Sequence, residues 1–326
     1  SLGARRMDEI IGRVELLEQI EHPETPRAQL LDLSGVLAAP VDRSAMRRRT
    51  AARNVRPGIV SLDEEILAHS AAKAPRVFTI GNHHLTVGAR IAGDLARAHG
   101  GGSAGPAEPL RLRFRGSAGQ SFGAFTLPRM HLHLEGEAND HVGKGLCGGE
   151  IVIRPFRAAA YVRAGASHVL LGNTALYGAT SGRLFAAGAA GDRFAVRNSG
   201  AVAVIEGAGD HCCEYMTGGI VVVLGPVGRN LAAGMSNGLA YVLDEGGTLE
   251  SGGRCNLDMV AVSHLNTMDE RVLRKLVQQH FHKTASPRAR LILAQWESYR
   301  LLFRKVAPPA VVATEPVHLQ STGSRA

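Results

Sequence analysis

The amino-acid sequence predicts a mainly β protein, a solenoid of about seven rungs with helical segments before and after it. First, glycine makes up 39 of the 326 residues, well above its usual share of about 7%. Second, short apolar runs recur at steps of 16 to 20 residues, and most of them end in glycine. Third, aromatic residues make up only 5% of the chain, so small and branched side chains must fill the interior. A parallel β-helix, which has a narrow core, meets all three conditions.

Each rung is expected to contribute one short strand followed by a corner. Glycine supplies the positive φ that such corners need, and Asn tolerates the same region. A β-sandwich is the alternative, but its turns need not keep a fixed period. Six of the runs close on glycine and two on Pro155 or Asp244; they span residues 110–115, 130–135, 150–154, 167–171, 183–187, 201–206, 220–224 and 239–243.

Residues 1–109 are predicted to form short helices joined by loops. Apolar side chains in residues 7–17 recur at helical spacing. Ser61–Glu64 has the pattern of a capping box that opens a helix. Another helix is expected over residues 86–99, and the glycine-rich run 100–106 after it is interpreted as a linker.

The rest of the chain is predicted to contain the solenoid, C-terminal helices and a disordered tail, over residues 110–265, 266–306 and 307–326. Thr267–Glu270 has a capping-box pattern, and Ser286 followed by Pro287 is typical of a helix N-cap and first turn. Apolar residues keep helical spacing as far as Val306, so the last helix is expected to reach that residue. Such a helix would cover an end of the solenoid, where unpaired strand edges are otherwise exposed.

The charge distribution argues against nucleic acid as a partner. The formal net charge is +8, but residues 116–250 carry more acidic than basic groups. The basic cluster Arg47–Arg49 has no aromatic neighbour on which a base could stack. No run of 18 apolar residues and no signal-peptide pattern occurs, so no membrane contact is expected. Four cysteines in this length do not make a disulfide framework, which predicts a cytoplasmic location.

The sequence contains no strong catalytic or metal-binding constellation. The three-glycine pattern of residues 143–148 precedes a strand rather than the helix that a dinucleotide site needs. His131 and His133 share one face of a strand but lack a third ligand. Residues 209–214 are expected to form an exposed corner whose polar side chains bond backbone amides. The alternative is an independent enzyme in which Cys213 of this corner is the nucleophile and His211 is its partner.

Long motifs in this chain resemble the C-terminal GXGXG β-helix domain of the glutamate synthase large subunit. They occupy residues 116–125, 134–140, 142–146, 172–173, 176–180, 194–200, 209–211, 213–219, 228–230 and 233–236. Residues 8–13 also look like the family's segment that follows the FMN-binding domain. The resemblance covers about residues 2–306.

The resemblance implies a right-handed β-helix with a structural role. The family makes two glutamates from glutamine and 2-oxoglutarate, and its FMN and iron–sulfur cluster belong to neighbouring domains. The chain itself is therefore expected to bind no cofactor, and Cys147, Cys212 and Cys213 are not expected to be cluster ligands. Expected partners are the glutaminase and FMN-binding domains, and the small electron-supplying subunit where the enzyme has one.

The resemblance also leaves an alternative, a stand-alone GXGXG subunit of a complex similar to N-methylglutamate synthase or formylmethanofuran dehydrogenase. In either case the matched residues are expected to shape the corners, with no catalytic, cofactor-binding or metal-binding residue among them. These structural positions are Gly116, Gly119, Gly123, Gly136, Asn139, Asp140, Gly143, Gly145, Gly172, Asn173, Gly178, Gly200, Gly209, Asp210, His211, Gly218, Gly219, Arg229 and Asn230.

Overall fold

A computed structural model describes most of the chain and divides it into two compact units, residues 1–59 and 60–326. The Arg47–Arg49 cluster, the linker residues 100–105 and the tail beyond residue 309 lie outside the described part. The described residues are 3–20, 30–39, 61–70, 76–98, 106, 108–156 and 168–309.

The described part of the first unit contains three single helical turns, η1 (Met7–Glu9), η2 (Val14–Leu16) and α1 (Ser34–Leu37). The helical spacing of residues 7–17 thus corresponds to two separate short turns rather than to one helix. Gly12 lies between the first two turns with φ +71°, a left-handed conformation that ends a right-handed helix. None of the residues in these three turns is buried.

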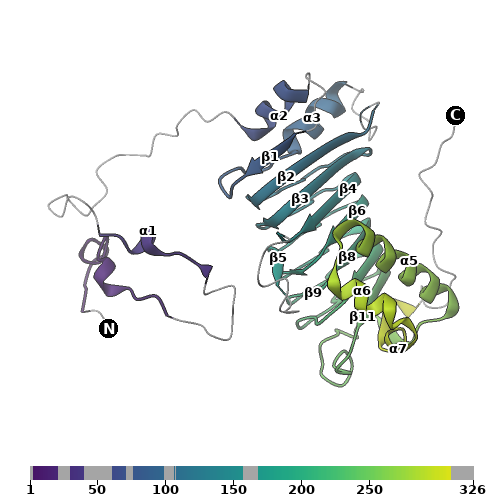
Figure 1. Cartoon of the computed structure of the whole chain (residues 1–326). Helices are drawn as coiled ribbons and strands as arrows, with labels where there is room; N and C mark the ends of the chain where they lie inside the picture. Colours follow the sequence, from purple (N-terminus) through teal and green to yellow (C-terminus); the bar gives the residue numbers. More distant parts are fainter. Residues whose placement is uncertain are drawn as a thin grey trace. The chain divides into compact units, whose positions relative to one another are not determined.

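The second unit is built around a parallel sheet in which each strand belongs to one coil of a solenoid (Figure 1). The register is continuous, so that Arg113 lies opposite His133 and His133 lies opposite Val152. The predicted parallel β-helix is confirmed, and seven of the predicted apolar runs overlap strands of this sheet. In sheet order the strands are β1 (Val77–Ile80), β2 (Leu110–Ala118), β3 (Met130–Ala138), β4 (Cys147–Arg154), β6 (Ser181–Ala186), β8 (Ser199–Ile205), β10 (Thr217–Val223) and β11 (Asn237–Leu243).

The eighth run belongs to a second row of strands on another side of the coils. This row consists of β5 (Val169–Leu171), β7 (Ala189–Ala190) and β9 (Gly207–Ala208). Leu171 of β5 pairs with Ala138 at the end of β3. On the main sheet Ile151 lies directly opposite Leu184. The sequence predicted two rungs between the runs that end at Pro155 and at Gly188, and these two rungs are one long coil.

Side chains that point into the solenoid form one apolar core. Along β3, alternate residues such as Leu132 and Leu134 are buried, as the two-residue period of a strand requires. Helices α2 (Leu62–Ser70) and α3 (Ala89–Ala98) add Ile66 and Ile91 to the same core. These helices therefore cover the apolar interior near the first coils.

Local hydrogen bonds explain where these two helices begin. The predicted capping box is confirmed, because the Glu64 N–H donates to Ser61 Oγ and the Ser61 N–H donates to the Glu64 carboxylate. The buried Asp63 carboxylate accepts hydrogen bonds from the N–H groups of Gly88 (2.8 Å) and Arg90 (3.0 Å). Asp63 thus satisfies backbone donors at the start of α3 from a different helix.

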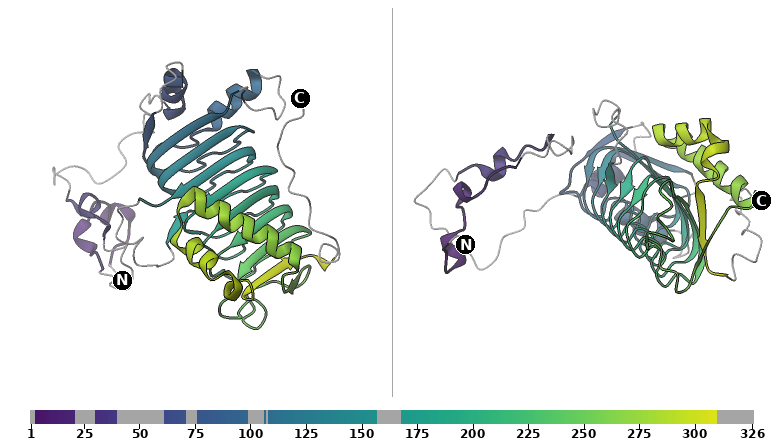
Figure 2. Two further views of the ribbon diagram at one scale, coloured as in Figure 1. Left: turned by 45° about the vertical axis from the view of Figure 1, so that its right-hand side comes forward. Right: turned by 90° about the horizontal axis from the view of Figure 1, so that it is seen from below.

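Three helices, α5 (Thr267–Thr284), α6 (Pro287–Ala294) and α7 (Trp296–Tyr299), cover the outer face of the later coils (Figure 2). Their buried residues, among them Leu273 and Ile292, form a second apolar cluster with outward side chains of the sheet. Ser286 is the N-cap of α6 as predicted. The cap of α5 is Asn266, one residue before the predicted capping box, and Asp269 completes the reciprocal bond.

The last predicted helix is wrong in its second half. The chain forms β13 (Phe303–Ala307), which pairs antiparallel with β11 and with β12 (Ala261–Ser263). Apolar residues from 292 to 306 do keep a helical spacing, but β11 would otherwise be an unpaired edge strand. The gain from pairing this edge overrides the local pattern.

A buried polar cluster joins α5 and β13 to the solenoid, and no local pattern in the sequence predicts it. The Tyr241 hydroxyl on β11 donates to Asp269 Oδ1 (2.8 Å), and Lys305 Nζ lies 3.2 Å from the same oxygen. All three residues are buried. Burial, followed by the negative charge of Asp269, raises the pKa of Tyr241, so the phenol stays protonated and donates.

Candidate functional site

The corners between coils share an unusual backbone, in which every second residue has a positive φ. At one corner these residues are His141, Gly143 and Gly145, with φ of +64°, +62° and +63°. Glycine adopts this region without strain, which explains the repeated glycines of the motif. The equivalent residues of the other corners are Ser121, Gly123 and Phe125; Thr174, Leu176 and Gly178; Arg193, Ala195 and Arg197; His211, Cys213 and Tyr215; and Asn230, Ala232 and Gly234.

This alternating backbone ties each corner to the coils on both sides. The N–H groups of His141 and Gly145 donate to carbonyls of the following coil, at 2.8 Å each. The N–H of Gly143 points the other way and donates to Phe122 O of the preceding coil (2.9 Å). The corner at residues 193–197 repeats the pattern. Backbone amides that a loop would leave to water are therefore paired along the solenoid.

A second ladder runs along the corners through side chains. The polar side chain of one corner accepts a hydrogen bond from the backbone N–H at the same position of the next coil: Asp140 Oδ1 accepts from Asn173 N (2.7 Å), and Asn173 Oδ1 accepts from Asp192 N (2.8 Å). The ladder continues from Asp192 to Asp210 N (2.9 Å) and from Asp210 to Arg229 N (2.7 Å). The polar residues expected at the corners are thus occupied by bonds within the fold.

The glycines before these polar residues leave room for the ladder. A Cβ on Gly209 would lie 2.1 Å from Asp192 Oδ1, which is far closer than van der Waals contact. The same conflict occurs at Gly172, Gly191 and Gly228, where the nearest atom is again the ladder oxygen. The structure therefore gives a steric reason for the glycine–Asp and glycine–Asn pairs of the motif.

The ladder ends on an ion pair at the surface. The Arg229 guanidinium contacts the second carboxylate oxygen of Asp210, through Nε at 3.2 Å and Nη2 at 3.0 Å. Hydrogen bonds from the Arg229 backbone and side chain lower the pKa of Asp210. At the other end, Asn139 Nδ2 donates to Asn82 Oδ1 (2.9 Å).

The corner over residues 209–214 does not have the geometry of a catalytic site. Cys212 and Cys213 are buried, which corrects the expectation of an exposed corner. The Cys212 Sγ contact and burial raise the pKa of Cys213, and burial raises that of Cys255 to about 12, so both thiols are protonated. Nδ1 of the predicted partner His211 lies 3.4 Å from Glu214 Oε1. A nucleophile needs a thiolate that substrate can reach.

The cysteines do not fit an iron–sulfur cluster or another metal centre. Burial raises the pKa of Cys147, and within the described residues no group of three His, Cys, Asp or Glu side chains could hold a metal ion. His131 and His133 do share the outer face of β3 as predicted. Burial lowers the pKa of both imidazoles, with the nearby Glu150 only partly offsetting it.

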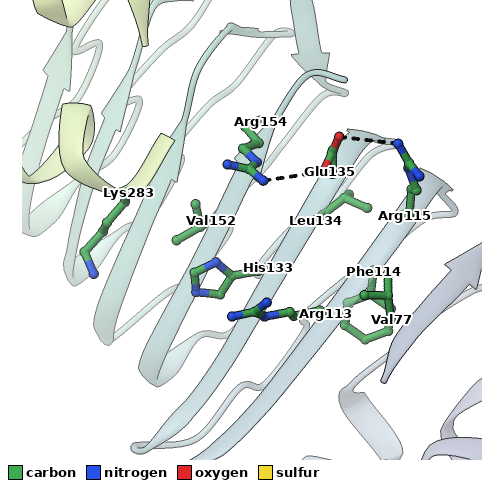
Figure 3. Close-up of a pocket in the computed structure, with 10 residues that line it drawn as sticks. All are labelled: Val77, Arg113, Phe114, Arg115, His133, Leu134, Glu135, Val152, Arg154 and Lys283. Atoms are coloured by element: carbon green, nitrogen blue, oxygen red, sulfur yellow. Dashed lines mark hydrogen bonds and ion pairs between the residues drawn. The ribbon is translucent and has the colours of Figure 1, made fainter. Parts of the chain in front are cut away.

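Charged side chains surround a hollow on the outer face of the first coils, as Figure 3 shows. Its volume is about 370 Å³. Arg115 and Arg154 lie on either side of Glu135, at 3.7 Å and 3.4 Å from its carboxylate. The remaining lining residues are Val77, Arg113, Phe114, His133, Leu134, Val152 and Lys283. Sequence reasoning missed this site, although Arg111, Arg113 and Arg115 alternate along one strand.

No helix of the described residues is both long enough and apolar enough to cross a membrane.

The family described as "GXGXG motif" matches residues 60–309. The chain is 45% identical over 318 residues to ferredoxin-dependent glutamate synthase 2 of Synechocystis sp., covering 95% of this chain and 20% of that protein. It is 44% identical to ferredoxin-dependent glutamate synthase 1 of Arabidopsis thaliana, covering 95% and 19%. The spinach enzyme, also named ferredoxin-dependent glutamate synthase, is 42% identical over 322 residues, with coverage of 95% and 19%. The chain thus spans about a fifth of the length of these relatives.

Proposed function

The chain belongs to the GXGXG-motif family, and from this premise we propose that it is the C-terminal structural portion of a glutamate synthase. The complete enzyme makes two glutamates from glutamine and 2-oxoglutarate. The observation that carries the proposal is the alignment of nearly the whole chain with one segment of these relatives at 42–45% identity. The named relatives are ferredoxin-dependent, which favours ferredoxin as the electron donor of this enzyme as well.

The geometry of the corners supports a structural rather than a catalytic role for this portion. The polar side chains that the motif repeats, such as Asp140, Asn173 and Asp210, accept backbone hydrogen bonds from the next coil. The thiols of Cys147, Cys213 and Cys255 have raised pKa values and do not suit a nucleophile or a cluster ligand. FMN and the iron–sulfur cluster accordingly belong to other domains of the enzyme in this proposal.

A rigid solenoid of this kind acts as a support between domains. Corner amides donate alternately to the following and the preceding coil, so the body resists bending more than a set of loops would. The glutaminase and FMN-binding domains pack against its faces, which hold the two domains at a fixed separation. Ammonia released at one site then reaches the other without loss to solvent.

The test compares the chain alone with the same chain joined to the polypeptide encoded immediately upstream. We expect the chain alone to be folded, colourless and inactive, and the complete protein to form glutamate with reduced ferredoxin. A flavin absorption band or glutaminase activity in the chain alone would refute the proposal. An upstream frame without glutaminase and flavin domains would favour a stand-alone subunit instead.

A matched pair of variants in the complete protein tests the supporting role. In Gly219→Val the Cβ atom alone would lie 2.3 Å from Ala201 O. The substitution should therefore distort a coil and lower glutamate formation more than glutamine hydrolysis. Leu257→Ala changes a side chain that is 50% exposed and serves as the control. Equal coupling of the two half-reactions in both variants, with Gly219→Val still folded, would contradict this role.

A further inference from the structure

The outward face of the main sheet changes character along the solenoid. One row of side chains crosses every strand in register, and it is apolar in the later coils but charged or polar in β2 and β3. The row consists of Val77, Arg113, His133, Val152, Phe185, Val204, Val222 and Tyr241. Helices α5 to α7 cover the apolar part, because Phe185, Val204 and Tyr241 belong to the cluster beneath them. Within the described residues the charged part has no such helical cover, and Figure 2 shows α5 to α7 lying over the later, green coils.

The uncovered part is strongly basic, and we call Arg111, Arg113, Arg115, Arg154 and Lys283 together the basic face. Lys283, at the end of α5, marks its boundary and pairs with Glu150 at 2.8 Å. Arg115 and Arg154 share the single carboxylate of Glu135. These five cations share the face with three carboxylates, those of Glu135, Glu150 and Glu137, the last of which accepts a hydrogen bond from Ser117 Oγ.

Arg111 and Arg113 are the cations with unused pairing capacity. Both are exposed on β2, and within the described residues neither forms an ion pair with a carboxylate. An arginine fork can bind a carboxylate through two parallel hydrogen bonds, and arginine is enriched in protein interfaces for this reason. These two side chains therefore have the geometry of anchors for an acidic partner.

An apolar contact adjoins these cations. Val77 on β1 is 55% exposed, lines the hollow and lies opposite Arg113. A phosphate or another small anion would leave this valine uncovered, and the hollow is open along a sheet face rather than closed around a ligand (Figure 3). A protein surface, with acidic and apolar side chains together, matches both features.

We propose that the basic face is a docking surface for an acidic segment of a partner domain. Carboxylates of that segment pair with Arg111 and Arg113, and an apolar side chain of the segment covers Val77. The surface lies beside the edge of α5, so a docked segment would continue the cover that the helices give to the later coils. That the partner is another domain of the same enzyme rests on the function proposed above; the preference for an acidic protein surface does not.

Nucleic acid fits this face less well. Glu135 and Glu150 interrupt the row of cations, so a continuous phosphate backbone would have to pass both carboxylates, whereas a protein segment can place its carboxylates at Arg111 and Arg113 alone. The phenylalanine that lines the hollow, Phe114, is buried in the core and offers bases no stacking platform, and Phe156 beside the hollow already carries the Arg115 guanidinium 5.7 Å from its ring centroid.

The first experiment measures binding of a fluorescein-labelled polyglutamate peptide to the 326-residue chain by fluorescence anisotropy. The variant Arg111→Glu/Arg113→Glu should weaken binding about tenfold, because two anchoring charges are reversed. The control Arg271→Glu/Lys275→Glu reverses two exposed cations on α5 with the same change in net charge. It should change the affinity by less than about twofold, since these charges lie outside the docking surface.

Three results of this experiment would overturn the proposal. One is no binding, and another is an equal loss in both variants, which would reflect net charge alone. The third is tighter binding of duplex DNA that depends on Arg111 and Arg113, which would make nucleic acid the occupant. Circular dichroism of all variants checks that the fold is kept.

A second experiment identifies the partner in the complete protein. A photo-cross-linking residue at Val77 should capture a peptide rich in Asp and Glu from another domain, whereas the same residue at Leu291, which is 41% exposed on α6, should not. Capture of a peptide without acidic residues would overturn the docking proposal. Polyglutamate binding at the basic face in a protein that lacks glutamate synthase domains would instead refute only the proposed function.

Discussion

Replacing an alanine by glycine should have different consequences for stability at two buried positions that look alike in the sequence. Ala195 and Ala203 are both fully buried in the solenoid core. Ala195 lies at the centre of a corner with φ +58°, whereas Ala203 lies on β8 with ordinary strand geometry. The pair therefore isolates the strain of a left-handed alanine from the loss of a methyl group.

The magnitudes follow from three contributions to the free energy of unfolding. Losing a buried methyl group costs about 0.8 kcal/mol, and the greater freedom of glycine in the unfolded chain costs about 0.5–1 kcal/mol. Ala203→Gly should thus destabilise by about 1.5 kcal/mol. At residue 195 the substitution also relieves about 1–2 kcal/mol of left-handed strain. Ala195→Gly should therefore be close to neutral.

Guanidinium chloride unfolding, followed by far-ultraviolet circular dichroism, measures both changes. The comparison is valid when the slope m is the same for both variants and the wild type, because a changed m signals a change in the unfolding reaction. A difference of about 1–2 kcal/mol between the variants is expected. Equal destabilisation by the two substitutions would refute the account of the corners as alternating left-handed residues.

Three further predictions concern the core, the corners and the outer face. Lys305→Met should destabilise the fold by about 3–5 kcal/mol in thermal unfolding, because it leaves the buried Asp269 carboxylate without its cation. The double variant Lys305→Met/Asp269→Asn should regain part of the lost stability. Gly219→Ala should lower the melting temperature more than Gly178→Ala, because both residues have positive φ but only the Cβ at 219 meets backbone, 2.3 Å from Ala201 O; equal melting temperatures would contradict the steric argument. Burial lowers the pKa of His133 in the folded chain. The unfolded chain therefore takes up a proton at a higher pH, and stability should fall as the pH drops below about 6.5. His133→Gln should flatten this fall in denaturant titrations at pH 7 and pH 5, and an unchanged fall would refute the prediction.

The coils could be predicted because their determinants are local and repeat. Short apolar runs and closing glycines keep a period of 16 to 20 residues, and the strands fall on those runs. Corner glycines such as Gly143 are recognisable for the same reason. The glycine–Asp and glycine–Asn pairs were also visible, although their role in a side-chain ladder depends on the stacking of coils and could not be read from one coil.

Other features depend on contacts between distant segments. Nothing local marks Leu176 or Ala195 as left-handed; the hydrogen bonds to the neighbouring coils impose that conformation. The strand β13 was predicted as helix because its pairing with the open edge of β11 is not encoded in its own spacing. The burial of Cys212 likewise follows from the turn of its corner into the core, where a polar sequence context suggested a surface position.

The outer face of the sheet shows how one repeat can carry two roles. The inward positions must stay apolar in every coil, because the core is continuous. The outward positions are free of that constraint, and each coil's outward residues match what covers them. In the later coils Phe185 and Val204 meet α5 to α7, whereas Arg113 and His133 occupy the same row where no helix of the described residues lies. A charged residue buried under a helix is costly. The change from charged to apolar residues therefore marks where α5 to α7 begin to cover the sheet, and the charged residues before it mark the part that the proposed partner covers.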